Sequence, residues 1–128
     1  LAEVEKAAEA LAAKGITPTV ADARFAKPLD VALIRQLVRH HKAVVTIEQG
    51  AQGGFGAMVL HYLANEGLLD GRCQLRTMTL PDRFIDQAAP DAMYADAGLT
   101  PIDIAAVALQ AIGSTTEVVM QGAHYAKR

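Results

Sequence analysis

Residues 20–30 read Val-Ala-Asp-Ala-Arg-Phe-Ala-Lys-Pro-Leu-Asp, and the prediction of the fold starts from this stretch. It begins with the end of a strand predicted over residues 16–22, where β-branched residues are frequent. Pro28 prevents a regular element from continuing, and the Asp30 side chain can accept from the first free N–H groups of a helix. Arg24 stands between them. The stretch therefore predicts a strand, a turn and a helix cap that together present one arginine.

The regions on either side alternate between helical and strand patterns. Apolar residues recur at helical spacing in four segments, which predicts helices over residues 1–14, 31–41, 55–66 and 101–112. Short apolar runs predict further strands over residues 43–48 and 73–80, and the first of these has the composition of a strand covered on both faces. A short helix is also predicted over residues 90–97.

This alternation determines the fold class. Strands separated by helices form right-handed crossovers, so we expect an α/β protein with three layers, α/β/α, and a mostly parallel sheet. Residues 1–113 form one predicted domain, and residues 114–128 form a polar tail. The tail contains one apolar run, Glu117-Val118-Val119-Met120, that is compatible with an added strand. Ligands of such sheets bind beyond the carboxyl ends of the strands.

Composition excludes several classes of function. With 128 residues and a formal net charge of −2, the chain has no basic stripe for nucleic acid. No apolar run approaches the ~20 residues of a membrane span. Cys73 is the single cysteine, which excludes a disulfide within the chain and fits a reducing, cytoplasmic location. The first residues do not resemble a signal peptide, and the absence of an initiator Met leads us to expect a piece of a longer protein.

Arg24 is the main candidate for a binding residue. Its guanidinium offers a planar set of donors that fits a phosphate or carboxylate, and it lies where a parallel sheet presents ligand groups. The alternative is an ion pair with Asp22 or Asp30 that stabilises the turn. The residues alone favour this local pair, because most arginines are solvated or locally paired.

The loop after residues 43–48 is a second candidate. Glu48 follows that strand and could act as a base or as a hydrogen-bond acceptor in a loop or interface, of which the second is favoured because it has no catalytic partner at a recognisable spacing. The turn Gly53-Gly54-Phe55-Gly56 could bind an anion at a helix N-terminus. It lacks the full pattern of a phosphate loop, so glycines that let the helix approach its strand are the favoured interpretation.

The remaining reactive side chains favour structural roles. His40 and His41 lack the partner spacing of a zinc site, and we expect His41 to interact with the last carbonyl groups of its helix. Cys73 lies within a predicted strand and is expected to be a small buried group rather than a nucleophile. We therefore predict no metal site and no catalytic residue in this chain.

Several motifs in order resemble the 1-deoxy-D-xylulose-5-phosphate synthase family. Residues 22–30 resemble its Asp-x-Arg-Phe-x-Lys-Pro-Leu-Asp motif, and Val45-Thr46-Ile47-Glu48 resembles its Val-Thr-Val-Glu. Three further matches follow in order, at Gly53-Gly54-Phe55-Gly56, Leu80-Pro81-Asp82-Arg83-Phe84-Ile85 and Gly98-Leu99. The resemblance covers residues 1–113 and implies the transketolase C-terminal domain fold, the last of three domains.

The resemblance implies part of an enzyme. The family joins pyruvate to glyceraldehyde 3-phosphate with loss of carbon dioxide, using thiamine diphosphate and Mg²⁺, in isoprenoid (terpenoid) and thiamine biosynthesis. Its first two domains carry the cofactor, so this chain alone is expected to be inactive. The implied partners are the rest of the polypeptide and a second subunit of a homodimer.

For the site, the resemblance implies that Arg24 binds the phosphate of glyceraldehyde 3-phosphate, with Asp22 and Glu48 as possible supporting residues. With the resemblance, phosphate binding by Arg24 is favoured over the local ion pair. Two other functions stay open: a non-catalytic structural or interaction module, and the equivalent domain of another thiamine enzyme such as a 2-oxoacid dehydrogenase β subunit.

The chain departs from the family pattern in two places. Gln49 stands where the family commonly has a second Glu. The strand that precedes residue 1 in the family, inside its sheet, is missing. Its loss would expose unpaired strand edges, so we expect the gap to be filled by a tail strand around residues 117–121 or by a neighbouring chain.

Overall fold

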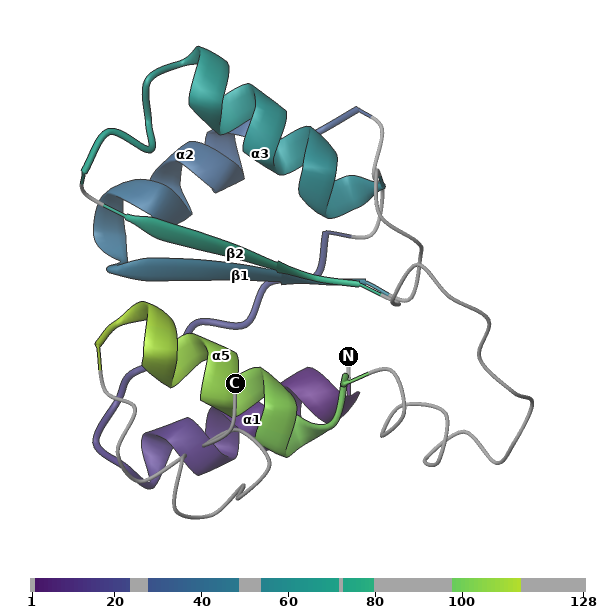
Figure 1. Ribbon diagram of the computed structural model, residues 1–128, viewed down its shortest axis with the longest axis vertical. Coiled ribbons are helices and arrows are strands. Elements are labelled where there is room, and N and C mark those ends of the chain that lie inside the picture. Colours follow the sequence, from purple (N-terminus) through teal and green to yellow (C-terminus); the bar gives the residue numbers. More distant parts are fainter. Residues whose placement is uncertain (1, 24–27, 49–53, 72, 80–97, 114–128) are drawn as a thin grey trace.

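Figure 1 shows the computed structural model of the 128-residue chain. It describes residues 2–23, 28–48, 54–71, 73–79 and 98–113. Arg24, Gln49, the helix predicted over residues 90–97 and the tail over residues 114–128 lie outside the described residues.

The described elements form three layers. Strands β1 (Ala43–Ile47) and β2 (Gln74–Met78) pair in parallel, from Ala43 opposite Gln74 to Ile47 opposite Met78. Helices α2 (Val31–His40) and α3 (Phe55–Asn65) cover one face of this sheet. Helices α1 (Ala2–Ala12) and α5 (Pro101–Ala111) cover the other (Figure 1). The predicted α/β/α architecture with a parallel sheet is confirmed.

Local sequence signals explain where the helices begin. The Asp30 carboxylate accepts from the backbone N–H of Leu33 at 3.1 Å, which caps α2 as predicted. The hydroxyl of Thr100 accepts from the N–H of Asp103 at 3.2 Å, and the Asp103 carboxylate accepts from the N–H of Thr100 at 3.0 Å. This reciprocal capping box, with Pro101 at the first helical position, fixes the start of α5.

Two hydrophobic clusters hold the layers together. One joins α1 and α5 to the sheet around Ala7, Ile104 and Leu109. The other joins α2 and α3 to the opposite face around Val38, Val59 and Leu63. The Leu63 side chain is fully buried, and burial of this kind contributes roughly 1.5–3 kcal/mol for one residue.

The strand predicted over residues 16–22 is wrong. Residues 16–23 have no regular secondary structure, although they run beside β1 and line the same cavity. A strand needs a neighbouring strand for its backbone groups, and among the described residues β1 pairs with β2 alone. Pro18 also lacks the N–H that a ladder would use. The sequence pattern was that of a strand, but no described strand lies against it.

Candidate functional site

The carboxyl end of β1 is tied to the start of α3 by Glu48. One carboxylate oxygen accepts from the backbone N–H of Phe55 at 3.0 Å, and the other accepts from the N–H of Gly56 at 2.6 Å. Both donors belong to the first turn of α3, where N–H groups have no partner within the helix and the helix dipole favours negative charge. Glu48 therefore caps the N-terminus of α3, although it lies seven residues before Phe55 in the sequence. Hydrogen bonding is the role that its position in the sequence favoured.

Gly56 explains why this turn is rich in glycine. A Cβ atom at this position would lie 2.7 Å from Oγ1 of Thr46 and 3.1 Å from Cγ2 of Thr77. No side chain fits there, so the glycine lets α3 lie directly on both strands. Because Glu48 already accepts from the first two N–H groups of α3, these donors are not available to a substrate anion. Close packing of helix and strand, the favoured interpretation, is confirmed at Gly56.

Thr46 is buried at the same end of the sheet. Its side chain is 7% exposed, and its hydroxyl has no hydrogen-bond partner among the described residues. A buried hydroxyl without a partner costs roughly 1–3 kcal/mol. The cost follows from the close approach of Gly56, which places the start of α3 against the Thr46 hydroxyl.

The other candidate residues, Asp22, Arg24 and Asp30, follow one another closely in the sequence. Asp22 lines a large cavity, and the residue is not without an interaction partner. Asp30 uses its carboxylate to cap α2. Arg24, between them in the chain, lies outside the described residues. The structure therefore places Asp22 and Asp30, and the ion pair of either with Arg24 stays a prediction.

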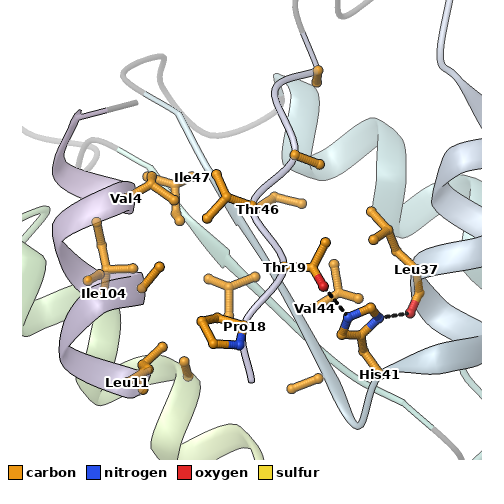
Figure 2. Close-up of a pocket in the computed structure, with 18 of the residues that line it drawn as sticks. Val4, Leu11, Pro18, Thr19, Leu37, His41, Val44, Thr46, Ile47 and Ile104 are labelled. Atoms are coloured by element: carbon orange, nitrogen blue, oxygen red, sulfur yellow. Dashed lines mark hydrogen bonds between the residues drawn. The ribbon is translucent and has the colours of Figure 1, made fainter. Parts of the chain in front are cut away.

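Residues 16–23 and β1 both line one large cavity, which we call the β1 slot. Its volume is about 820 Å³. Figure 2 shows Val4, Leu11 and Ile104 on one side, from α1 and α5, and Leu37 and His41 on the other. The slot is thus bounded by a strand, by a segment with no regular structure and by the inner faces of both helix layers.

Two hydrogen bonds link residues 16–23 to the end of α2 on one side of the slot. Nδ1 of His41 lies 2.9 Å from the carbonyl oxygen of Leu37, and Nε2 lies 2.8 Å from the hydroxyl of Thr19 (Figure 2). In a neutral ring, Nδ1–H donates to the Leu37 carbonyl and Nε2 accepts from the Thr19 hydroxyl. The predicted helix-end role of His41 is confirmed. The contact with Thr19 was not predicted, because 22 residues separate the partners.

A cluster of polar side chains on the surface joins α2 to α3, and the sequence analysis did not predict it. Arg35 Nε donates to the hydroxyl of Tyr62 at 2.5 Å, and its Nη2 donates to the Glu66 carboxylate at 2.6 Å. The hydrogen bond with Tyr62, together with Glu66, raises the pKa of the Arg35 guanidinium above its ordinary value. Arg35 and Glu66 are each 43% exposed, so water screens this pair. No local spacing rule connects residues on different helices.

Cys73 has the structural role that its position predicts. Its side chain is buried, and this burial raises the pKa of its thiol. A buried thiol that stays protonated is a weak nucleophile. Among the residues that the structure describes, no three His, Cys, Asp or Glu side chains are grouped to hold a metal ion. Across the same residues, no helix has the length and apolar character needed to span a membrane.

Comparison with known proteins identifies the family. The family described as "Transketolase, C-terminal domain" matches residues 1–104. This chain belongs to that family. A solved structure described as "Split gene transketolase, inactive beta4 tetramer" superposes with a TM-score of 0.77 at 30% identity, covering 89% of this chain and 36% of that chain.

Two curated relatives extend the comparison. The chain is 63% identical over 113 residues to 1-deoxy-D-xylulose-5-phosphate synthase 2 of Jannaschia sp. (strain CCS1), covering 88% of this chain and 18% of the relative. It is 59% identical over 111 residues to 1-deoxy-D-xylulose-5-phosphate synthase of Rhodobacter capsulatus, covering 87% and 17%. The resemblance to this synthase family is confirmed, and the chain spans less than a fifth of either relative.

Proposed function

We propose that this chain is the C-terminal domain of a 1-deoxy-D-xylulose-5-phosphate synthase, and that it supplies Arg24 to the substrate phosphate. The supporting observation is the 63% identity over 113 residues to a protein of that name. The complete enzyme would condense pyruvate with glyceraldehyde 3-phosphate in the cytoplasm, as the first step toward isoprenoid precursors.

The chemistry of Arg24 suits this role. A guanidinium donates two parallel hydrogen bonds to a phosphate and keeps its charge at every physiological pH. Arg24 follows Asp22, which lies at the end of the segment beside β1, and precedes the cap of α2. The N–H groups of Phe55 and Gly56 at the start of α3 already donate to Glu48, so Arg24 is a better candidate than this helix N-terminus for binding an anion.

The described residues do not fit a site for thiamine diphosphate and Mg²⁺. They contain no group of three metal-ligating side chains, and Glu48 is bonded to backbone N–H groups of α3. The resemblance to the synthase family implies that other domains of the complete enzyme hold the cofactor. Arg24 would orient the phosphorylated aldehyde toward a reaction performed elsewhere.

Isolation of this domain should abolish activity, and the complete enzyme should require the remaining domains and a second subunit. The similar solved structure is a split-gene transketolase that is described as an inactive tetramer. A second candidate function, a non-catalytic structural module with Arg24 in a local ion pair, is favoured only by the nearby carboxylates of Asp22 and Asp30.

Replacement of Arg24 in the full-length enzyme tests the proposal. Loss of a charged hydrogen bond to phosphate costs roughly 1.5–3 kcal/mol, so Arg24→Ala should raise KM for glyceraldehyde 3-phosphate roughly 10- to 100-fold. KM for pyruvate should not change. D-glyceraldehyde, which lacks the phosphate, should be used about equally by the variant and the parent enzyme.

The matched control is Arg39→Ala, which removes an exposed arginine near the end of α2. It should leave both KM values unchanged. If Arg24→Ala lowers the melting temperature while KM for glyceraldehyde 3-phosphate stays constant, the structural module is correct and the proposed role of Arg24 is wrong.

A further inference from the structure

The start of α3 differs from the starts of α2 and α5 in the origin of its cap. Asp30 and Thr100 cap α2 and α5 from the N-cap position itself. The N-cap residue of α3 is Gly54, which has no side chain to accept from the free N–H groups of the helix. The carboxylate of Glu48 accepts from two of these groups instead. The first turn of α3 thus binds an anionic group that does not belong to its own cap residue.

A further donor lies beside this first turn. The hydroxyl of Thr46, a residue that is 7% exposed, has no hydrogen-bond partner among the described residues. A Cβ atom on Gly56 would lie 2.7 Å from Oγ1 of Thr46 and 3.2 Å from Oε2 of Glu48, so both oxygens face the same point. Buried polar groups normally have a partner. The Thr46 hydroxyl is therefore a third donor for an anion at this position.

We propose that the first turn of α3 and Thr46 form a carboxylate-binding site, and that Glu48 is its built-in occupant and excludes free anions from it. The two oxygens of one carboxylate match the two N–H groups, which they contact at 3.0 and 2.6 Å. Glu48 is thus a specificity residue, because it keeps substrate and solvent anions away from α3. The proposal is independent of the substrate role of Arg24, and the two can fail separately.

The backbone of Glu48 explains why a free anion does not displace its side chain. The N–H of Glu48 donates to the carbonyl of Met78 at 3.0 Å, which fixes the residue at the end of β1. Figure 1 shows this end of β1 on the same side of the molecule as the start of α3. Only side-chain torsions must be fixed when this carboxylate binds, whereas a free anion also loses translational and rotational freedom. Removal of the Glu48 carboxylate should therefore open the site to free carboxylates.

Titration with acetate, followed at each backbone amide by NMR, tests the proposal in the 128-residue chain. In Glu48→Ala, the methyl and carboxylate groups of acetate can replace Cγ and the carboxylate of Glu48. The N–H signals of Phe55 and Gly56 should shift saturably, with a Kd on the order of 1–100 mM. In the parent chain these signals should shift less than about a tenth as much, because the attached carboxylate competes. Sodium chloride at equal ionic strength should not reproduce the shift.

Two further variants separate charge, space and the third donor. Glu48→Gln keeps the volume of the side chain without its charge, and it decides the question where Glu48→Ala does not fold. Its neutral amide is a weaker acceptor than a carboxylate, so acetate should displace it and shift the same two signals. Thr46→Val, added to either Glu48 variant, should weaken acetate binding roughly 2- to 10-fold. An unchanged affinity would overturn the inclusion of Thr46 in the site.

Glu66→Ala is the matched control, because it removes a carboxylate after the opposite end of α3 that binds the side chain of Arg35. It should leave the two signals as insensitive to acetate as they are in the parent chain. Saturable shifts of equal size in the parent chain would overturn the proposal, since Glu48 would not exclude anions. Failure of acetate to bind either Glu48 variant would also overturn it, since the first turn of α3 would then not be an anion site.

Discussion

The two edges of β1 differ in how completely they are built. On one edge β2 pairs with β1 in register over five residues, and Gly56 lets α3 lie directly on both strands. On the other edge lies the slot, bordered by residues 16–23 without a ladder. The segments beside both edges, residues 16–22 and 73–80, have the sequence pattern of a strand. The difference teaches that a strand forms only where its partner is present, whatever the local propensity.

The largest expected effect comes from replacing one leucine on each side of β1, Leu63 on the packed side and Leu37 on the slot side. Leu63→Ala removes a fully buried side chain from the cluster between α3 and the sheet, and should lower the free energy of unfolding by about 3–5 kcal/mol. Leu37→Ala removes a half-buried side chain that lines the slot, and should cost about 1–2 kcal/mol. Urea unfolding of both variants measures the difference. Equal costs would mean that both sides are packed equally well.

Gly56→Ala should break the packed edge directly. The new Cβ would meet Thr46 Oγ1 at 2.7 Å and Thr77 Cγ2 at 3.1 Å, so α3 must move away from the strands. Overpacking of this kind costs about 1–3 kcal/mol, measurable by urea or thermal unfolding. Thr46→Ala removes the nearest atom. In a double-mutant cycle, the double variant should therefore lose less stability than the sum of the two single variants, and strict additivity would contradict the predicted clash.

Much of the fold could be predicted from local patterns. The caps at Asp30 and Thr100 and the parallel crossover each depend on residues close in sequence or on a general rule of handedness. The contacts of Arg35 with Tyr62 and of Thr19 with His41 join distant segments, and no spacing rule finds them. The strand predicted at residues 16–22 failed for a related reason, since its outcome depends on a neighbour elsewhere in the chain.

In the candidate site, too, some features could be predicted from the sequence and others could not. Glu48 stands next to a predicted strand end, so its hydrogen-bonding role could be predicted, but its two donors on α3 required the structure. Arg24 was identified through a motif rather than through geometry, and its role still depends on the kinetic test. Asp30 shows how a candidate ion-pair partner can already be used, here as the cap of α2.

The smallest expected effect concerns Cys73, directly before β2 on the packed side of the molecule. Burial raises the pKa of its thiol above the ordinary value of 9.0, so the folded state favours the protonated form. This contribution to stability is fully present below about pH 9 and is lost as the pH rises through the pKa of the folded state. Cys73→Ala should therefore show a shallower loss of stability above pH 9 than the parent chain.

Reactivity of the same thiol gives a second measurement on the packed edge. At about pH 8 a disulfide reagent should modify Cys73 at least roughly tenfold more slowly in the folded chain than in urea, because the buried thiol is protonated and shielded. Gly56→Ala, which pushes α3 away from the strands, should increase the rate in the folded chain. Leu37→Ala, on the slot side, should change the rate less. If both variants increased it equally, the two edges of β1 would not behave as separate regions.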